Sequence, residues 1–330
     1  MIWTLVTGGT GDIGAELVRE LLRKATPVRI LSRDQSRQME LKALLERDGF
    51  PPELYRFFIG DVRDIGRLKR AFRDVHTIYH LAALKHVDSC EYNPEEAIKT
   101  NVGGTSNVID AAIASGVQRV IYSSSDKAAE PNNIMGATKL TAEKLITQAN
   151  SHHPEISFAC VRFGNVLGSR GSVLPVWREQ LRSRGAISIT DPVMTRYVLT
   201  LKRSVELLLQ AARCVGGEVL LRKMPVVKLE TLAKVFTAAW RRTHDVDRVG
   251  SHVTGPRPGE TTHEKIITCE ESTRTHSWGD YYVILPTMLF GSRDYSRYRE
   301  PVPVRMYDSS QREPLSLDAL RDLLLVNNLI

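Results

Sequence analysis

Residues 7–14 read T-G-G-T-G-D-I-G and connect a short apolar run at residues 3–6 to a segment with helical periodicity. Apolar residues of that segment fall on one helical face, at Ile13, Leu17, Val18, Leu21 and Leu22. Glycines at 8 and 11 let the backbone approach a bound group, and a glycine at 14 permits close packing of helix on strand. A strand, a glycine turn and a helix in this order predict the first unit of a parallel α/β sheet.

The same alternation continues through the first half of the chain. Further strands are predicted at residues 28–31, 55–59, 77–81 and 120–122, and a helix through 108–113. Strands separated by helical crossovers favour a parallel sheet that is covered on both faces. We therefore expect an α/β fold with a doubly wound parallel sheet.

The alternation weakens after about residue 168, where Pro, Gly and Arg cluster. A helix-like stretch at 204–212 and an apolar run at 218–221 predict a return to the main sheet. We expect a main domain built from residues 1–168 and about 196–225. The remaining segments, about 169–195 and 226–330, are expected to form a smaller, discontinuous α+β domain.

Composition limits the classes to which the chain can belong. With 330 residues, of which 42% are hydrophobic, it can bury one large core or two modest ones. Four dispersed cysteines without a C-x-x-C pair argue against a disulfide framework and against a zinc site, and favour a reducing cytoplasm: Cys90, Cys160, Cys214 and Cys269. The histidines show no ligand spacing, so we propose no metal.

The lengths of the apolar runs and the distribution of charge limit the partners that the chain can bind. No apolar run reaches the roughly 18 residues of a membrane span, and the first strand begins too early for a signal peptide, so we expect no membrane association. The net charge of +7 is dispersed and not interleaved with aromatic residues. This distribution favours an anionic small molecule over nucleic acid. We also expect a homo-oligomer.

The glycine turn predicts a dinucleotide site, because helix amides that follow such a turn bind pyrophosphate. At the end of the second strand, Arg33, helped by Ser32 and Arg37, suits a ribose 2′-phosphate and favours NADP. Asp34 could instead hold an unphosphorylated ribose and favour NAD, and this alternative stays open. The predicted cofactor contacts are Gly8, Thr10, Gly11, Asp12, Ile13, Ser32, Arg33, Arg37, Asp61, Val62, Ala82, Ala83, Lys85, Asn101 and Lys139.

Residues 123–139 read S-S-S-D-K-A-A-E-P-N-N-I-M-G-A-T-K and predict the reactive part of the chain. Asp126 and Lys127 come directly after an apolar strand, where parallel sheets present side chains to a ligand. They offer a proton donor and a proton acceptor side by side, and Lys139 follows on the next helix. Four residues before Lys139 stands Met135, which cannot ionise.

Several further segments share a pattern. They read G-D-V-R-D, L-A-A-L-K-H-V, F-G-N-V-L-G-S-R-G-S-V, M-T-R and R-P-G-E. Together with the glycine turn and S-S-D-K-A-A-E-P-N-N, they resemble the extended short-chain dehydrogenase/reductases. Within these, residues 3–285 are similar to the UDP-N-acetylglucosamine 4,6-dehydratases of polysaccharide and nonulosonic acid biosynthesis. Most of the superfamily has tyrosine where this chain has Met135, and a Ser-Met-Lys arrangement resembles the capsular-polysaccharide subgroup, which includes enzymes that invert carbon 5.

The resemblance implies a Rossmann domain that binds NADP, a second domain that binds a nucleotide sugar, and a lyase activity. Oxidation of carbon 4 to a ketone makes the carbon-5 proton removable, so that water can leave across carbons 5 and 6. Lys127 would act as the base and Asp126 as the acid that protonates the leaving hydroxyl. Lys127 must then be neutral, and we expect Lys139 and the nicotinamide to lower its pKa while Asp126 raises it.

Carbon-4 oxidation also requires an acceptor for the hydroxyl proton. Ser125, next to Asp126, is the best-placed hydroxyl for this relay, and Lys139 would hold the nicotinamide ribose. Met135 is interpreted as an apolar filler against the sugar or the core. The predicted catalytic set is Ser125, Asp126, Lys127, Met135 and Lys139.

Substrate contacts are predicted in the second half of the chain. Arg196 and Arg257 could neutralise a diphosphate as planar forks, and Glu260 could accept ribose hydroxyl groups. The complete set predicted for a UDP-sugar is Lys85, His86, Asn165, Arg170, Ser172, Val173, Arg196, Arg257 and Glu260. Two alternatives remain: a UDP-sugar 4-epimerase, which needs no elimination pair, and a non-catalytic NADP-sensing protein.

Overall fold

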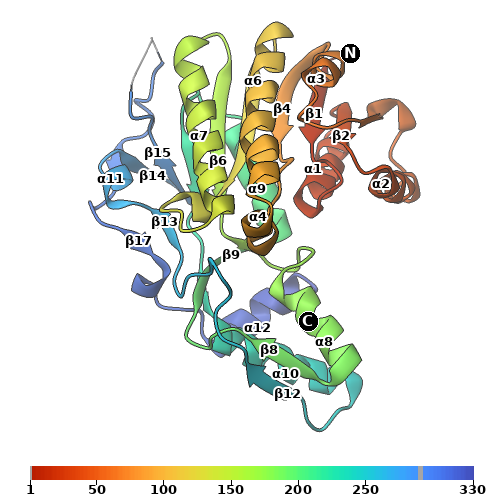
Figure 1. Cartoon of the computed structure of the whole chain (residues 1–330), viewed down its shortest axis with the longest axis vertical. Helices are drawn as coiled ribbons and strands as arrows, with labels where there is room; N and C mark the ends of the chain where they lie inside the picture. Colours follow the sequence, from red (N-terminus) through yellow and green to blue (C-terminus); the bar gives the residue numbers. More distant parts are fainter. Residues whose placement is uncertain (1, 289–292) are drawn as a thin grey trace.

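The computed structural model describes residues 2–288 and 293–330, and a ten-stranded sheet forms its centre (Figure 1). Seven parallel strands make up most of it: β1 (Trp3–Thr7), β2 (Val28–Ser32), β3 (Tyr55–Ile59), β4 (Val75–His80), β5 (Arg119–Ser125), β6 (Ser157–Phe163) and β10 (Val219–Arg222). Three antiparallel strands extend one edge: β15 (Tyr281–Ile284), β14 (Thr275–Trp278) and β16 (Glu300–Pro301). The full order is β16-β14-β15-β10-β6-β5-β4-β1-β2-β3.

Helices cover both faces of this sheet, as the doubly wound prediction requires. The main domain contains α1 (Asp12–Arg23), α2 (Gln35–Arg47), α3 (Ile65–Ala71), α4 (Val87–Tyr92), α5 (Pro94–Ala97), α6 (Gly104–Ala114), α7 (Ile134–His152) and α9 (Leu201–Ala211). Helix α6 packs between α3 and α7 on one face, while α1 packs against α9 on the other. The predicted strands and helices of the first half are therefore confirmed, although β5 ends three residues later and α6 begins four residues earlier than the predicted segments.

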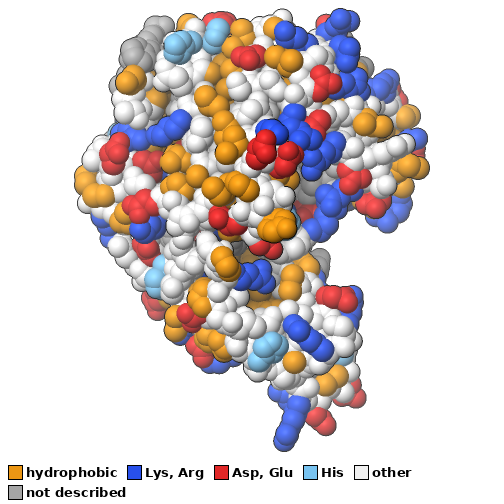
Figure 2. Space-filling view, in the orientation of Figure 1, with side chains coloured by type: hydrophobic (Ala, Val, Ile, Leu, Met, Phe, Trp, Pro, Cys, Tyr) orange, Lys and Arg blue, Asp and Glu red, His pale blue; other side chains and the backbone are white. Residues whose placement is uncertain are grey.

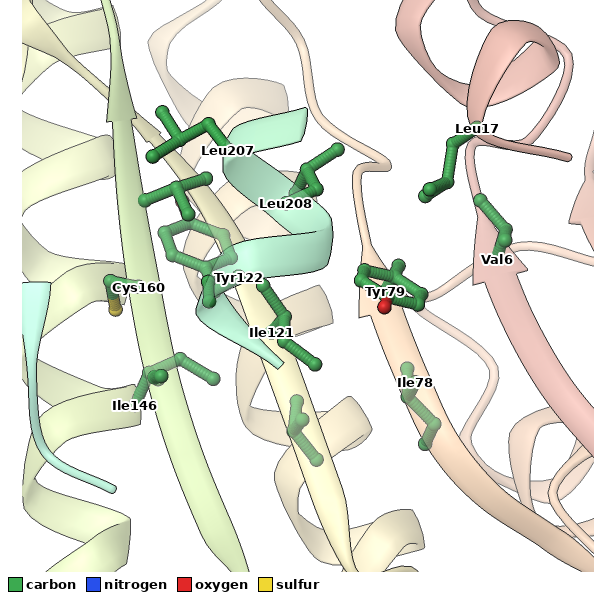
Figure 3. Close-up of a cluster of buried hydrophobic side chains, with 14 of the residues drawn as sticks. Val6, Leu17, Ile78, Tyr79, Ile121, Tyr122, Ile146, Cys160, Leu207 and Leu208 are labelled. Atoms are coloured by element: carbon green, nitrogen blue, oxygen red, sulfur yellow. The ribbon is translucent and has the colours of Figure 1, made fainter. Parts of the chain in front are cut away.

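Apolar side chains from the strands and from both helical layers fill the space beside the sheet (Figure 3). Val6, Ile78 and Ile121 come from neighbouring strands, and Leu17 and Leu208 come from the helices that cover them. Each of these five side chains is at most 1% exposed. Burial on both faces explains why these strands read as continuous apolar runs instead of alternating ones.

The smaller domain lies below the carboxyl ends of the parallel strands in Figure 1. It contains α8 (Val173–Arg184), α10 (Leu229–His244) and α12 (Leu317–Val326), with strands β8 (Ala186–Ile189) and β12 (Gly250–Val253). A three-stranded sheet of β7 (Asn165–Val166), β9 (Thr195–Leu199) and β11 (Val226–Lys228) joins the domains. The pair β13 (Lys265–Ile267) and β17 (Tyr307–Asp308), with the short α11 (Cys269–Ser272), lies beside it.

The domain division differs from the sequence expectation at one segment. We assigned residues 226–330 to the smaller domain, but β14, β15 and β16 lie in the main sheet. These strands are only two to four residues long and pair antiparallel, without the helical crossovers on which the prediction relied. The return through α9 and β10 agrees with the prediction.

A buried ionic network connects β6 and α7 of the main domain with α11. The guanidinium of Arg162, on β6, donates to Glu143 on α7 at 2.6 and 2.9 Å and to Glu271 on α11 at 2.6 and 2.8 Å. It also donates to the Ile266 carbonyl at 3.0 Å. All five donor hydrogens thus have a nearby acceptor, which is the condition for a stable buried guanidinium.

The charged side chains are dispersed over the surface, as they are along the sequence. Figure 2 shows cationic and anionic side chains interspersed over the visible face, which narrows between the two domains. Among the described residues, no helix has both the length and the apolar content to cross a membrane.

Candidate active site

The turn between β1 and α1 forms a cradle that only glycine leaves open. Gly8 has a φ of +66°, and a Cβ there would lie 2.8 Å from the Ala82 amide nitrogen. A Cβ at Gly14 would lie 2.5 Å from the Gly8 carbonyl oxygen. Helix α1 has no side-chain cap at Gly11, so its first-turn amides have no acceptor from a capping side chain. These residues fit the pyrophosphate of a dinucleotide.

The end of β2 carries the residues predicted to select the cofactor. The Ser32 hydroxyl lies 2.8 Å from the Thr10 hydroxyl, which links this end to the glycine turn. Asp34 caps α2 by accepting the Arg37 amide at 3.0 Å, and its second oxygen lies 3.3 Å from Arg37 Nε. Arg33 is more than half exposed. Asp34 is thus engaged by its own helix, whereas the Arg33 side chain is largely exposed.

Asp61 follows β3 and faces Arg33 at 3.7 Å. Burial raises the pKa of the Asp61 carboxyl, but hydrogen bonds from Arg63 outweigh this effect and the net pKa is lowered. Val62 is buried, and its side chain lies against Gly104, where a Cβ would come within 2.6 Å. Asp61 therefore remains an anion beside Arg33 and Arg63, while Val62 serves packing.

Asn101 lies in a π-helical segment, Ile98–Gly103, a kind of local irregularity that is frequent at functional sites. Its amide group accepts from the Leu84 nitrogen at 2.8 Å and donates to the Leu84 carbonyl and the Thr138 hydroxyl, both at 3.0 Å. Asn101 therefore fixes the segment after β4, which includes Ala82 and Ala83, against α7. In this structure its polar atoms are used within the protein.

Arg170 lies against the glycine turn. Its Nε and backbone nitrogen donate to the two Asp12 carboxylate oxygens at 2.6 and 2.7 Å, and Nη2 donates to the Thr10 carbonyl at 2.7 Å. The Lys85 ammonium donates to the Arg170 carbonyl at 2.9 Å. Arg170, which was predicted to bind substrate, thus contacts the predicted cofactor turn, and Lys85 contacts Arg170.

A cavity of about 690 Å³ lies between the carboxyl end of the main sheet and the smaller domain. Its walls include Asp126 and Lys127 from the main domain. They also include six of the nine residues predicted to bind substrate: Lys85, His86, Asn165, Arg196, Arg257 and Glu260. The other three, Arg170, Ser172 and Val173, are not part of its wall. This volume suits a small organic ligand.

Ser125, the last residue of β5, and the two residues that follow it form one hydrogen-bonded unit. The Ser125 hydroxyl donates to Asp126 Oδ1 at 2.8 Å. The same oxygen accepts from the backbone nitrogen of Lys127 at 2.9 Å and from its ammonium at 3.1 Å. Asp126 is 3% exposed, and its other oxygen, Oδ2, has no hydrogen-bond partner among the described residues. A buried carboxylate oxygen left in this state is poised for a ligand group.

Glu264 is a second carboxylate on Lys127, and the sequence analysis missed it. Its Oε1 lies 3.1 Å from the Lys127 ammonium and 3.4 Å from Arg196 Nε. Glu264 lines the cavity and is 5% exposed. It precedes β13, whose apolar run of two residues is too short to predict a strand, so no periodicity marked this residue.

The groups that shift the pKa of Lys127 are not all those that the sequence predicted. Burial lowers the pKa of the Lys127 ammonium, but Asp126 and Glu264 outweigh burial and raise it. The cation that opposes them is Arg196, and not Lys139 as expected. Lys127 is therefore an ammonium in the ligand-free protein, although a base must be neutral.

Lys139, on α7, lies beneath the site. Its ammonium donates to the Ser123 carbonyl at 2.7 Å and lies 4.7 Å from the centre of the Tyr122 ring. Burial lowers the pKa of Lys139 to about 8. Met135, one turn earlier, packs in a small apolar cluster with Cys90 and Ala97. This environment agrees with the interpretation of Met135 as a filler.

Arg196 and Glu260 are already paired. Arg196 Nη2 lies 3.3 Å from Glu260 Oε1, and Glu260 Oε2 accepts the backbone nitrogen of Arg257 at 3.2 Å. The guanidinium of Arg196 thus lies between two carboxylates, Glu260 and Glu264. A diphosphate at this position would compete with those carboxylates.

The remaining predicted residues lie at the N-terminal ends of α8 and α4. Ser172 precedes α8 and has a buried hydroxyl without a partner among the described residues, and Val173 is the first helical residue. His86 precedes α4 and lies so close to Gly171 that a Cβ there would be 2.6 Å from its ring. Gly171 therefore brings this loop onto the cavity wall.

Comparisons with known proteins agree on one family. Residues 4–286 match the family described as polysaccharide biosynthesis protein. The chain is 40% identical to a UDP-N-acetylglucosamine 4,6-dehydratase (inverting) of Campylobacter jejuni, over 88% of this chain and 84% of that one. It is 35% identical to a UDP-glucose 4-epimerase of Rickettsia rickettsii, over 97% and 94%. Among solved structures, Pen from Bacillus thuringiensis is similar with a TM-score of 0.93 and 35% identity, over 100% and 98% of the two chains.

Proposed function

The chain belongs to the polysaccharide biosynthesis family of the extended short-chain dehydrogenase/reductases, and from this premise we propose that it is a nucleotide-sugar 4,6-dehydratase. The substrate proposed is UDP-N-acetylglucosamine or a close relative, and the cofactor proposed is NADP. The observation that carries the proposal is the Asp126–Lys127 pair on the cavity wall, with Asp126 Oδ2 unpartnered.

Elimination of water needs an acid for the departing hydroxyl and a base for the adjacent proton. Asp126 can protonate a departing hydroxyl through Oδ2, and Lys127 can remove the adjacent proton once it is neutral. Ser125 already donates to Asp126 and can pass on a proton from the carbon-4 hydroxyl. NADP, when bound at the glycine turn, supplies the oxidation of carbon 4 and the later reduction at carbon 6.

NADP is proposed over NAD because of the residues after β2. Arg33 is largely exposed, with Ser32 next to it in the chain, while Asp34 caps α2 and pairs with Arg37. An arginine that can approach a 2′-phosphate favours NADP. An acidic residue that is free to bind the ribose would favour NAD.

The epimerase alternative keeps support from the Rickettsia relative. Both activities begin with oxidation of carbon 4, so the products distinguish them. We would incubate the protein with UDP-N-acetylglucosamine in deuterated water and read the product by mass spectrometry and NMR. A dehydratase gives a product that has lost water and gained deuterium at carbon 5, whose configuration the spectrum also reports.

Asp126→Asn and Lys127→Ala are the variants that test the residues. Each should abolish water loss and leave cofactor binding nearly intact, because both side chains face the cavity and not the glycine turn. A product of unchanged mass with inverted carbon 4 would identify an epimerase instead. Tight cofactor binding without any sugar conversion would favour the NADP-sensing alternative.

A further inference from the structure

Glu264 is held against Lys127 by hydrogen bonds with Ser309, which directly follows β17. Its backbone nitrogen donates to the Ser309 hydroxyl at 2.9 Å, and the Ser309 nitrogen donates to the Glu264 carbonyl at 2.9 Å. Ser309 itself is fully buried. The Glu264 carboxylate therefore meets Lys127 from a segment that Asp126 does not belong to, and the ammonium lies between two carboxylates at 3.1 Å each.

Relative to a neutral amine and two carboxylates, the group of Asp126, Lys127 and Glu264 carries one additional proton in the ligand-free protein, the one that makes Lys127 an ammonium. Oxidation of carbon 4 releases a second proton from the sugar hydroxyl, which Ser125 passes to Asp126. If Asp126 and Lys127 were the only two sites, both would then be protonated. Asp126 could act as an acid, but no base would remain for the carbon-5 proton.

We propose that Glu264 takes the proton of Lys127 before water elimination and returns it at the end of the turnover, an inference that rests on the proposed dehydratase function. The lysine is then a free amine that removes the carbon-5 proton, while Asp126 protonates the carbon-6 hydroxyl and water leaves. When carbon 6 is reduced at the expense of the reduced cofactor, Lys127 returns its proton to carbon 5. Glu264 then reprotonates Lys127, and all three groups regain their starting charges.

The surroundings of Glu264 suit a group that gains and loses a proton. Burial raises the pKa of its carboxyl, and the negative charge of Asp126 raises it further, while the cations Lys127 and Arg196 oppose both effects. When Asp126 is neutral, Lys127 has Glu264 as its one remaining carboxylate neighbour among those that contact it. When substrate displaces water from such a site, the desolvation cost of keeping both groups charged rises, which shifts the balance toward a neutral amine and a neutral acid.

Glu264→Gln keeps the size of the side chain and removes its proton-binding capacity. We expect sugar oxidation in a single turnover, read from the absorbance of reduced nicotinamide, to stay near that of the wild type. Water loss at neutral pH should fall by about 100-fold. It should recover as pH rises, because the Lys127 proton must now leave for the solvent, whereas water loss by the wild type should show no such rise.

Proton release gives a second readout. A pH indicator in weak buffer should detect proton release when Glu264→Gln oxidises the sugar, rising toward one proton per site over the pH range in which water loss recovers, and none for the wild type. In the substrate-free protein, an NMR titration of labelled lysine should show the Lys127 amine losing its proton at lower pH in the variant. This shift is expected because one of the two anions that raise the Lys127 pKa is gone.

Glu260→Gln is the matched control, since Glu260 also pairs with Arg196 but is not paired with Lys127. It should alter KM without releasing a proton and without a new pH dependence. The proposal is overturned if Glu264→Gln loses water at the rate of the wild type, or if its loss is independent of pH and without proton release. Wild-type protein that oxidises the sugar without losing water would instead refute the dehydratase function itself, before any variant is compared.

Discussion

Lys139 and Ser123 are joined by a 2.7 Å hydrogen bond from the lysine ammonium to the serine carbonyl, near the end of β5 and three residues before Asp126. No carboxylate of the described residues forms an ion pair with this ammonium. Burial lowers the pKa of Lys139 to about 8, against an ordinary value of 10.5. The folded protein therefore holds a cation at a position that resists charge.

This arrangement predicts that Lys139→Met is more stable than the wild type at pH 7. Between pH 8 and 10.5 the unfolded wild-type chain binds more protons than the folded one, so its free energy of unfolding rises with pH. The advantage of the variant, up to roughly 3 kcal/mol, should shrink over that window. Urea unfolding of both proteins at pH 7, 8.5 and 10 measures this advantage. A difference in free energy of unfolding that does not change with pH would refute the lowered pKa of Lys139. Activity should be lost at every pH.

A second prediction concerns the alcohol proton. Ser125→Ala removes the hydroxyl that donates to Asp126 and should lower carbon-4 oxidation by about 100-fold or more. A large isotope effect from deuterium at carbon 4 should accompany the loss, because oxidation would become the slow step.

Met135→Leu is the comparison for that variant. It nearly conserves volume within the cluster of Cys90 and Ala97, and we expect most of the activity to remain. An inactive Met135→Leu beside an active Ser125→Ala would show that the thioether has a specific role and that the serine relay is wrong.

The cofactor prediction is that NADP raises the melting temperature more than NAD does. Arg33 is exposed beside Ser32, whereas Asp34 is engaged with Arg37. Arg33→Asp should shift the preference toward NAD. Thermal shifts with each dinucleotide measure this, and equal shifts for the wild type would contradict it.

The buried network of Arg162 gives a prediction for stability. Arg162→Met leaves Glu143 and Glu271 buried without their cation, which should cost about 3–5 kcal/mol. The same change combined with Glu143→Leu and Glu271→Leu should recover most of the loss, because no uncompensated charge remains. Chemical denaturation of the single and triple variants checks the order; a triple variant no more stable than the single one would show that packing, not charge, sets the cost.

The first half of the fold could be predicted because each element carries its own periodicity. Strands β1 to β5 are apolar runs bounded by turns, and α1 shows a clear apolar face. Strands β14 to β16 could not be predicted in the main sheet. They are short and pair antiparallel, so their place depends on contacts made far along the chain.

Some residues of the candidate site could likewise be predicted from the sequence, and others could not. Asp126 and Lys127 could be predicted because they follow β5 directly, and a strand end fixes where side chains point. Glu264 lies 137 residues after Lys127 in a loop, and only the packing of β13 and Ser309 brings it to the ammonium. Arg170 was predicted for the substrate, yet it contacts Asp12, because loop geometry decides which neighbour an arginine reaches.

The contacts of Arg170 have a consequence for how the protein is handled. They fasten a loop at the border of the smaller domain across the turn that cradles the proposed dinucleotide, through Asp12 and Thr10. A cofactor that regains its oxidation state in every turnover has no need to exchange, and leaving would require this loop to detach. Loss of the dinucleotide and loosening of the border between the domains then become one event, so the cofactor content of a purified sample reports how intact that border is.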